Sequence, residues 1–511
     1  MYKNDITSTL ETWDRDHYNV VDKEEEGLKQ QLQSPELDSR EQRVIKAELE
    51  ELQEENRGIE ITKRGKSLDI HVFTSYLLTR FMMIMVMEKL AFYNFKQRRY
   101  QFLPESVERK FFAEVLGEYD SSLWSPGLEG NYTMAVRRRL VCYKQYSIPK
   151  GVVFFPNGYL DLHKKLFEKK INYKHINFSS LGFMYDPEAD CPQFLEFLRD
   201  IFNDDQAVID NIQEIFGYTF AYGEYPIQKF FVFYGMGRNG KGVLTRLLTD
   251  LHSEENVSAV FLDDLSERFG KQNVYDKVLN ISGEREQKKP LDTAVIKTLT
   301  GGDLIDVELK YEKAFSIRIS CKFIICCNQA IKVNNDSSKG FFSRLHPINF
   351  PNTYKELRAG ESKEEGVRYE DKTIYSRLKE ELPGIFNWAM EGYYRLADNS
   401  WNMTPCQAID ELKQKYYYEA NPVIHFFSAC IQVGDEKKII SMPDVYRHYL
   451  SWANTHDIRT EEFTNKREFH QAFRKCMEEV HRSSQAKMIN GTNYYIGIEM
   501  KSNWKQRVCF I

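Results

Sequence analysis

The sequence predicts a multidomain α/β protein organised around a parallel sheet. Its 511 residues exceed the size of a single typical domain, and the 42% hydrophobic content is enough to give three or four domains a core each. From Lys229 onward the pattern becomes an apolar strand, a glycine-rich loop, an amphipathic helix and further apolar strands, which is typical of an α/β sheet. Near the C-terminus, two helical segments followed by a β-hairpin predict a further, smaller domain.

Composition indicates a protein without a membrane anchor. The longest apolar run, Phe81 to Met87, falls far short of the roughly 20 residues that span a bilayer, so we expect it to form a core helix. The N-terminal residues contain no basic segment followed by an apolar stretch and a cleavage site, so we expect a cytoplasmic protein. The nine cysteines include no C-x-x-C pair and are expected to be buried, reduced thiols.

The formal net charge of the chain is -5 at pH 7. The molecule as a whole therefore lacks the positive field of a small nucleic-acid-binding domain. Any contact with nucleic acid must depend on locally basic surfaces.

The first 66 residues predict a charged helical extension. Within residues 21–60, 19 of 40 side chains are charged and 13 of these are acidic. Ile45, Leu49 and Leu52 form only a thin apolar stripe, which is typical of an exposed helix or helical hairpin. Such an arm could bind a partner or support oligomerisation, but a solvated extension is the favoured interpretation.

Residues 67–222 mix helices with short strands and predict an α+β domain. "KLAFYNFKQRRYQFL" alternates like a hairpin, and "ESVERKFFAEVL" has the period of a helix. "GVVFFPNGYLDLHKKLF" predicts two strands around an Asn157-Gly158 turn, and two amphipathic helices follow it up to Tyr222. Three arginines at 137–139 could contact phosphate, although a solvated basic face is the favoured interpretation.

The stretch "FFVFYGMGRNGKGVLTRLL" matches G-x-x-x-x-G-K through Gly235, Gly240 and Lys241. Glycines allow backbone N–H groups to converge on phosphate oxygens, the following helix adds its dipole, and the lysine reaches the β and γ phosphates. A buried strand before the loop and a helix after it complete the expected context. The candidate nucleotide-binding residues are Gly235, Met236, Gly237, Arg238, Asn239, Gly240, Lys241, Gly242 and Val243.

Nucleotide hydrolysis also needs acidic, polar and cationic groups on neighbouring elements. Glu284 and Glu286 close the apolar strand "VLNISGERE", Asn328 ends "FIICCN", and Arg344 lies in "GFFSRLHPINF". Each alone has an ordinary structural explanation. Together and in this order they predict, with Lys241, a catalytic set.

Five motifs carry a family resemblance: "GMGRNGKG", "SGERE", "IKTLTGGDLIDVELKY", "FIICCNQ" and "FFSRLHPINF". They closely resemble the helicase half of the phage, plasmid and poxvirus-type primase-helicases, members of superfamily 3 within the AAA+ class. The similarity extends over about Val152 to Leu396. It implies a central AAA+ P-loop ATPase domain at 223–396, an α+β pre-helicase domain at 67–222, and ATP and Mg²⁺ as cofactors.

The resemblance assigns a role to each candidate residue. Lys241 falls on the phosphate loop, and Glu284 and Glu286 fall on the Walker B position, with Glu284 as the metal ligand; which of the two is the principal acid stays open. Asn328 falls on sensor 1. Arg344 falls on the arginine finger, which reaches the ATP of a neighbouring subunit.

An arginine finger implies a homo-oligomeric ring, with a hexamer expected. The stretch "GGDLIDVELKYEKAFSIRI" corresponds to the β-hairpin that such helicases direct into their central channel, with Lys310 as the DNA-binding residue for single-stranded DNA. One lysine per subunit, repeated around a ring, would concentrate positive charge despite the acidic chain.

Two positions depart from the family pattern. The Ser or Thr that usually follows the phosphate-loop lysine is Gly242, and the frequent Arg doublet is Ser343-Arg344. Without the hydroxyl, one inner-shell magnesium ligand is absent, and water can take its place because magnesium retains several waters. We therefore expect a working nucleotide site.

Residues 397–511 predict a C-terminal winged-helix domain. Ser441 can cap a first helix, a second carries Phe469 and Phe473, and Asn490-Gly491 is a strong hairpin signal. From residue 431 to the end there are 13 Lys plus Arg against 10 Asp plus Glu, and Lys466, Arg467, Arg474 and Lys475 are expected on the exposed side of the second helix. Binding of origin duplex DNA and docking of a protein are both open interpretations.

A primase active site is not recognisable. Paired carboxylates on strands would be needed to hold two metal ions, and the nearest candidates, Asp161 and His163, lie in "YLDLHKK", which is better explained as a simple strand. Priming activity is therefore doubtful.

The expected function is that of an ATP-hydrolysing replicative DNA helicase of a phage, plasmid or other mobile genetic element, active in the cytoplasm of a bacterial host cell. The alternatives are a bifunctional primase-helicase and an ATP-dependent origin-binding or loading protein that does not unwind. A nucleotide kinase is a weaker alternative, because it would have no use for the "TGGD" hairpin.

Overall fold

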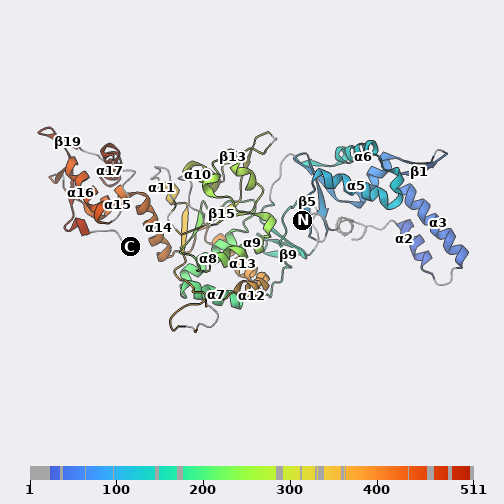
Figure 1. Ribbon diagram of the computed structural model, residues 1–511, viewed down its shortest axis with the longest axis horizontal. Coiled ribbons are helices and arrows are strands. Elements are labelled where there is room, and N and C mark those ends of the chain that lie inside the picture. The colour runs from blue at the N-terminus through green and yellow to red at the C-terminus, as the bar shows by residue number, and fades with distance from the viewer. Residues whose placement is uncertain are drawn as a thin grey trace. The chain divides into compact units, whose positions relative to one another are not determined.

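The structure is a computed structural model of the 511-residue chain. The residues that it describes are 23–34, 38–63, 65–95, 97–143, 149–169, 176–283, 292–310, 313–328, 331, 339–357, 362, 364–435, 437–456, 465–481 and 486–506. The chain divides into two compact units (Figure 1). One comprises residues 1–187 and 251–253, and the other comprises residues 188–250 and 254–511.

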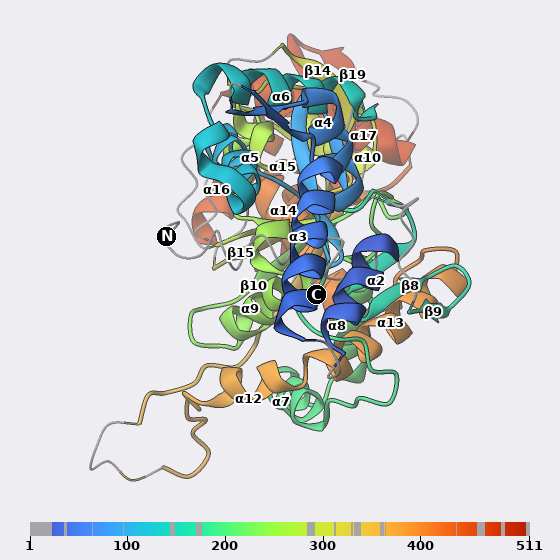
Figure 2. The same cartoon turned by 90° about the vertical axis from the view of Figure 1, so that its right-hand side faces the viewer.

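The first unit begins with two helices, α2 (Lys23–Leu32) and α3 (Ser39–Asn56), which lie side by side (Figures 1 and 2). The outer face of α3 is charged, and Ile45 and Leu49 on its inner face are half-buried. A two-stranded hairpin of β1 (Ile59–Thr62) and β2 (Gly65–Leu68) follows. Of the two expected forms for this extension, the structure has the helical hairpin.

A four-stranded sheet forms the centre of the first unit, with strand order β5-β4-β3-β6. Its apolar face packs against helices α4, α5 and α6 through a core that includes Phe92, Phe111 and Tyr132. The elements are α4 (Ile70–Arg80), β3 (Met83–Val86), β4 (Lys89–Asn94), β5 (Arg99–Phe102), α5 (Glu105–Asp120), α6 (Pro126–Arg139) and β6 (Cys142–Tyr143). The hairpin and the helix expected between residues 89 and 120 are both confirmed.

The helix expected over Phe81 to Met87 is wrong, because Met83–Val86 is strand β3. Asp69 caps the preceding helix by accepting hydrogen bonds from the N–H groups of His71 and Val72, and that helix ends before the apolar run. Met87 and Glu88 both have positive φ, at 50° and 62°, as a two-residue hairpin turn requires. A short, uniformly apolar run has no periodicity that separates a helix from a buried strand.

A second, three-stranded antiparallel sheet follows in the first unit: β7 (Val152–Phe155), β8 (Gly158–Asp161) and β9 (Leu166–Glu168). The expected turn at Asn157-Gly158 is present, and the Asn157 amide bonds both backbone groups of Tyr185. Asp161 accepts hydrogen bonds from the N–H groups of His163 and Lys164, at 3.1 and 3.0 Å. These bonds, with the adjacent Lys164 ammonium, hold the pKa of Asp161 below its usual range although partial burial opposes them. The Asp161 carboxylate therefore closes the turn that follows strand β8. This agrees with the interpretation of the segment as a simple strand.

The second unit begins with helices α7 (Pro192–Phe202) and α8 (Gln206–Tyr218), confirming the expected helix pair. Helix α8 lies beside the later helix α13 (Leu382–Asp398), which α12 (Ile374–Glu380) precedes (Figures 1 and 2). Phe194, Phe216 and Trp388 join the three longer helices through edge-to-face and tilted ring contacts.

A five-stranded parallel sheet forms the centre of the second unit, with strand order β11-β12-β15-β10-β16. Phe231 of β10 pairs with Ile324 on one neighbouring strand and with His346 on the other. The strands are β10 (Phe230–Tyr234), β11 (Val257–Ser258), β12 (Leu279–Ser282), β15 (Lys322–Cys327) and β16 (Leu345–Asn349). The expected mixed α/β architecture with a parallel sheet is thereby confirmed.

Helices and one hairpin complete this part of the chain. They are α9 (Lys241–His252), α10 (Thr293–Gly301), α11 (Lys339–Phe342) and the antiparallel hairpin of β13 (Leu304–Val307) with β14 (Phe315–Arg318). Short 3-10 turns span Glu254–Asn256, Leu262–Asp264 and Gly270–Asn273. Val307 and Ile317 of the hairpin are buried in the same core as Phe230 and Leu345 of the sheet.

The C-terminal residues form a core of their own around Phe426, Tyr449, Trp452 and Phe473. Ser441 caps α16 as expected, since its hydroxyl accepts a hydrogen bond from the N–H of Asp444 at 3.2 Å. The elements are α14 (Gln407–Ala420), α15 (Pro422–Cys430), β17 (Ile431–Val433), β18 (Ile439–Ser441), α16 (Met442–Thr455), α17 (Lys466–His481), β19 (Ala486–Ile489), β20 (Thr492–Ile496) and β21 (Ile498–Met500), with a 3-10 turn at Trp504–Gln506. The hairpin at Asn490-Gly491 joins β19 to β20. The four-domain division expected from the sequence stays a prediction.

Within the described residues, no helix is long and apolar enough to cross a membrane.

Arg137 is not part of the solvated basic face that the sequence led us to expect, but pairs with a buried carboxylate. Its guanidinium makes a two-pronged ion pair with Glu108, at 3.0 and 2.7 Å, and Glu108 is only 1% exposed. Arg138 beside it is exposed. The partner carboxylate lies on α5, so no local pattern indicates the pair.

We expect Arg137→Ala to destabilise the first unit by about 3 kcal/mol, because it leaves the Glu108 charge buried without its partner. Arg138→Ala is the matched control and should change stability by less than about 0.5 kcal/mol. Hydrogen exchange of α5 and α6 in the intact chain measures both effects. Equal protection in the two variants would contradict the role of the buried pair.

The buried His346 should lower the free energy of unfolding of the protein at acid pH. It is buried in β16, where burial and, secondarily, the Lys229 and Lys413 charges lower its pKa from 6.5 to about 3, and its Nε2 lies 3.0 Å from Oδ1 of Asn211. Between these pKa values the unfolded chain binds the proton and the folded chain does not, so stability falls as the pH falls. The loss should be on the order of 3 kcal/mol between pH 6.5 and 4.

Comparing the pH dependence of Tm for the wild type and His346→Asn isolates this contribution. The variant keeps a neutral side chain and should show a shallower decline below pH 6.5. Parallel curves would assign the acid sensitivity to other groups.

Candidate nucleotide-binding site

The glycine-rich loop connects β10 to α9 at the carboxyl edge of the parallel sheet. Ligands of open α/β sheets bind at this edge, because the loops that follow the strands meet there. The N–H of Gly235 donates to the carbonyl of Cys327 on β15, at 3.1 Å, so the loop begins against its neighbouring strand. The sheet thereby fixes where the loop starts.

Lys241 lies inside the loop at the first turn of α9 and is 4% exposed. Its ammonium donates to the carbonyl of Gly235 at 2.5 Å, to Oδ1 of Asn239 at 3.2 Å and to the carbonyl of Met236 at 3.4 Å. A buried ammonium at a helix N-terminus combines a full positive charge with the positive end of the helix dipole. This combination attracts an anion such as phosphate.

Asn239 also lies inside the loop, and its side chain is 3% exposed. Its Oδ1 accepts from Lys241, but its Nδ2 has no hydrogen-bond partner among the described residues. A buried donor without a partner costs about 1–3 kcal/mol. An anionic oxygen bound in the loop would remove that cost.

The loop backbone alternates between left-handed and ordinary conformations. Gly235 has φ of +152°, Arg238 +59° and Gly240 +90°. Such alternation turns successive N–H groups toward a common point and forms a concave anion-binding surface. A methyl group on Gly240 would also lie 3.0 Å from the Ile201 side chain on α7, so the loop is packed from that side.

Gly242 faces open space, since a Cβ built there meets no atom within 4 Å. The missing hydroxyl of this loop is therefore not a result of crowding. The nearby Thr245 hydroxyl does not replace it, because it donates to the carbonyls of Lys241 and Gly242 at 3.1 and 3.2 Å. The Met236 side chain is 69% exposed at the loop surface.

Glu284 and Glu286 lie outside the described residues, so their expected catalytic roles and the metal-binding role of Glu284 stay predictions. The strand that leads to them, β12, ends at Ser282 and pairs with β15. Within the described part of the chain, no cluster of three or more His, Cys, Asp or Glu side chains could hold a metal ion.

Asn328 directly follows β15 and is exposed at the same edge of the sheet as the loop. Tyr234, the last residue of β10, pairs with Cys327, the last residue of β15. Adjacent parallel strands that end together bring their next residues to neighbouring positions. The structure therefore brings Asn328 and the loop to one edge.

Arg344 lies at the opposite, amino edge of the sheet, because it directly precedes β16 and Leu345 pairs with Phe230. Its guanidinium donates to the carbonyl of Gly340 at 2.7 Å and to Oε1 of Gln228 at 3.2 Å, and its Nε is buried without a partner in the described residues. A five-residue strand is about 16 Å long. The structure therefore does not bring Arg344 together with the phosphate loop of the same chain.

Lys229, which the sequence patterns did not single out, lies next to Arg344 in the structure, and Lys413 lies close enough for its charge to act on Lys229. Lys229 donates to the carbonyl of Ser343 at 3.1 Å, and burial, with a smaller effect of the Lys413 charge, lowers its pKa to about 8. Burial also lowers the pKa of Lys413. The signal available in the sequence was a lysine immediately before an apolar strand.

The expected hairpin is present, and Lys310 is exposed beyond its first strand, β13. Lys313, which precedes the second strand, is also exposed. Glu308 pairs with Arg268 at 2.7 Å, which ties the strand end to the neighbouring segment. The hairpin is anchored by buried Val307 and Ile317, although Leu304 at its open end is exposed, and it presents two cations in the segment between its strands.

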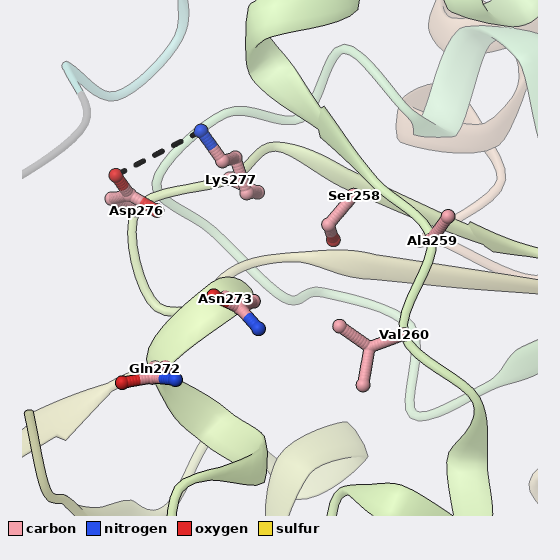
Figure 3. A pocket seen from close by; sticks show the side chains of 7 residues that line it. All are labelled: Ser258, Ala259, Val260, Gln272, Asn273, Asp276 and Lys277. Atoms are coloured by element: carbon pink, nitrogen blue, oxygen red, sulfur yellow. Dashed lines mark ion pairs between the residues drawn. The ribbon is translucent and has the colours of Figure 1, made fainter.

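A separate hollow of about 460 Å³ lies at the far side of the sheet, next to β11 (Figure 3). β12 and β15 lie between that strand and β10, so the hollow is not part of the loop site. Its polar groups include Lys277, which pairs with Asp276 at 3.9 Å. Its lining residues are Ser258, Ala259, Val260, Gln272, Asn273, Asp276 and Lys277.

Three family models match separate stretches of the chain. Residues 71–203 match a family described as D5 N terminal like, residues 233–344 match a family of unknown function (DUF5906), and residues 418–506 match a family described as poxvirus D5 protein-like. No curated protein matches the chain.

Three solved structures of the NrS-1 C terminal region, all apo forms, resemble the chain. Their sequence identities are 14%, 13% and 15%, and their TM-scores are 0.47, 0.48 and 0.49. The alignments cover 82–84% of this chain and 96–98% of theirs.

The fold defines a mixed α/β multidomain protein with a parallel sheet and a glycine-rich loop at its carboxyl edge. The two D5-type matches then indicate that residues 71–203 and 418–506 are similar to D5-like proteins.

Two glycines in the loop give a matched test of the site. A methyl group on Gly235 would lie 2.5 Å from Nδ2 of Asn239 and 2.7 Å from the carbonyl of Phe350, whereas one on Gly237 meets no atom within 4 Å. We expect Gly235→Ala to weaken ATP binding by about 10-fold or more, a loss of at least 1.4 kcal/mol. Gly237→Ala introduces no clash within the protein and should weaken ATP binding less than Gly235→Ala does.

Equilibrium binding of a fluorescent ATP analogue measures both variants, with Tm as the control for folding. Equal affinity in the two variants would mean that the Gly235 backbone does not shape the site.

Proposed function

We propose that this chain is an ATP-dependent replicative DNA helicase, a superfamily 3 member of the AAA+ class that moves along single-stranded DNA as a ring. The observation that carries the proposal is the separation of two groups. Lys241 belongs to the carboxyl edge of the sheet and Arg344 to the amino edge. Both can serve one ATP only if the two residues come from different copies.

The loop supports ATP as the ligand. Its buried ammonium, its left-handed backbone positions and the unpaired amide of Asn239 suit a chain of phosphates. Mg²⁺ bound with ATP would offset the negative charge that develops on the transferred phosphoryl group. Glu284 is the proposed metal ligand, with Glu286 beside it as the alternative acid.

The edge-to-edge arrangement supports a ring. An interface that joins the carboxyl edge of one copy to the amino edge of the next is heterologous, and such interfaces close into rings when the rotation permits. Arg344 would then stabilise charge on the neighbour's ATP, and Asn328 would act as the polar sensor on the same subunit as Lys241. A hexamer is the proposed size.

The β13–β14 hairpin supports single-stranded DNA as the track. Val307 and Ile317 anchor it in the core of the sheet, and Lys310 and Lys313 are exposed in the segment between its two strands. Cations repeated around a ring would bind successive phosphates of one strand. Movement of the hairpins with each ATP cycle would carry the strand.

The C-terminal residues support contact with duplex DNA. Helices α15, α16 and α17 share a core with the β18-β20-β19 sheet, an arrangement consistent with a winged helix. Lys466, Arg467, Arg474 and Lys475 are exposed on α17. Docking of a protein on this surface is the alternative.

The primase-helicase alternative has less support, because Asp161 is used to close a turn. An origin-binding or loading protein is the other alternative; its ATPase could respond to DNA, but it would not displace a strand. As a helicase of a phage, plasmid or other mobile element, the protein would work in the bacterial cytoplasm.

Mixing two inactive variants tests the shared site. We expect Lys241→Ala to lose ATP binding, and Arg344→Ala to keep binding but to lose at least about 100-fold in turnover. An equal mixture should recover up to about a quarter of wild-type turnover, because that share of head-to-tail borders combines Lys241 of one copy with Arg344 of the next. ATP hydrolysis and strand displacement on forked DNA are measured together.

The control mixture combines Lys241→Ala with the double variant Lys241→Ala/Arg344→Ala, in which no border can be complete. Recovery in this control, or full turnover by pure Arg344→Ala, would falsify the shared site. ATP hydrolysis without strand displacement by the wild type would favour the loading protein.

A further inference from the structure

The phosphate loop is held from outside by residues 350–357, which continue β16 and are called the strap here. The strap begins as an extension of the sheet, because the N–H of Phe350 donates to the carbonyl of Tyr234 at 2.8 Å. The Phe350 carbonyl then lies against Gly235, where a methyl group would approach it to 2.7 Å. The strap is therefore in contact with the first residue of the loop.

The next contact sets the direction of one loop peptide. The N–H of Tyr354 donates to the carbonyl of Arg238 at 2.8 Å. In a planar trans peptide, the carbonyl of one residue and the N–H of the next point in opposite directions. A carbonyl of Arg238 that faces the strap therefore turns the N–H of Asn239 away from the strap. Arg238 adopts positive φ, at +59°, in the same peptide run.

The strap is itself anchored on the last turn of α7. The Asn352 amide donates to the carbonyls of Asp200 and Ile201, at 2.9 and 3.2 Å, and to Oδ1 of Asn203 at 2.9 Å. The Tyr354 hydroxyl donates to a carboxylate oxygen of Asp200 at 2.5 Å. Burial and, secondarily, this contact raise the pKa of Tyr354, so its hydroxyl stays protonated as a donor.

A third anchor comes from Arg368, which follows the strap in the chain. Its guanidinium binds the Asp200 carboxylate, the Asp200 carbonyl at 2.8 Å and Oδ1 of Asn203 at 2.9 Å. The C-terminal end of α7 therefore binds three side chains from the segment after β16, those of Asn352, Tyr354 and Arg368.

Helix α7 also packs on the opposite end of the loop. The Ile201 and Phe197 side chains lie 3.0 and 3.3 Å from the position of a methyl group on Gly240. The loop is therefore bracketed, with the strap at Gly235 and Arg238 and the helix at Gly240. The polar contacts at Asp200 join the two sides of the bracket.

We propose that Asn352, Tyr354 and Asp200 are positioning residues for the nucleotide: they fix the strap on α7, and the strap fixes the loop peptide that faces phosphate. None of the three needs to touch ATP. This inference rests on the proposed ATP site and adds to it the residues that set nucleotide affinity from outside the loop.

The exposure of these groups separates positioning from general stability. The Asp200 side chain is 49% exposed and that of Arg368 is 36% exposed. Exposed ion pairs typically add less than about 1 kcal/mol to stability. Their removal should therefore disturb the loop more than the fold.

The experiment compares Asn352→Ala, Tyr354→Phe and Asp200→Ala with the wild type in the full chain. We expect the KM for ATP to rise about 5- to 10-fold in each variant, with kcat within about twofold and Tm nearly unchanged. The double variant Asp200→Ala/Tyr354→Phe should be no worse than the more affected single variant, because both remove the same contact.

Asp371→Ala is the matched control. Asp371 is a similarly exposed carboxylate, at 47%, and binds Thr373 and Arg377 next to α12. It should leave both KM and kcat unchanged.

The outcomes are distinct. Unchanged KM in the three variants, or a lower kcat at unchanged KM, would overturn the positioning role while leaving the ATP site intact. A lower Tm with unchanged kinetics would assign the contacts to stability alone and would also overturn it. A wild type that neither binds nor hydrolyses ATP would remove the proposed function itself.

Discussion

The parallel pairing of β10 with β15 on one side and β16 on the other is the constraint on which the rest of the site depends. Because the strands run in one direction, everything that follows a strand gathers at one edge and everything that precedes a strand gathers at the other. The loop and Asn328 fall in the first group, and Lys229 and Arg344 fall in the second. Each copy therefore carries different functional groups at the two edges of its sheet, as a direct result of strand direction.

The sequence was sufficient for those features that depend on local chemistry. Strand β10, the glycine-rich loop and helix α9 follow from one run of residues, and so do the Ser441 cap and the Asn490-Gly491 turn. The candidate residues could be named in chain order for the same reason. Their spatial grouping could be anticipated only as far as the order of parallel strands implies it.

Features that depend on distant partners were beyond the sequence. The run from Phe81 to Met87 has no periodicity, and the preceding helix cap and the following turn decide that it is a strand. The bond between Arg137 and Glu108 joins two helices, and the contacts of Asn352 with α7 join residues about 150 positions apart. In each case the side chain alone indicates an exposed polar group, and only the fold supplies its partner.

The distance between the two edges of the sheet has a consequence for when ATP would be consumed in the cell. If each copy carries the first half of a reaction centre on one side and the second half on the other, a solitary copy cannot complete the reaction. Dispersed molecules would then leave the nucleotide pool untouched. ATP hydrolysis would start only where copies have assembled edge to edge, so the architecture itself would make turnover depend on assembly.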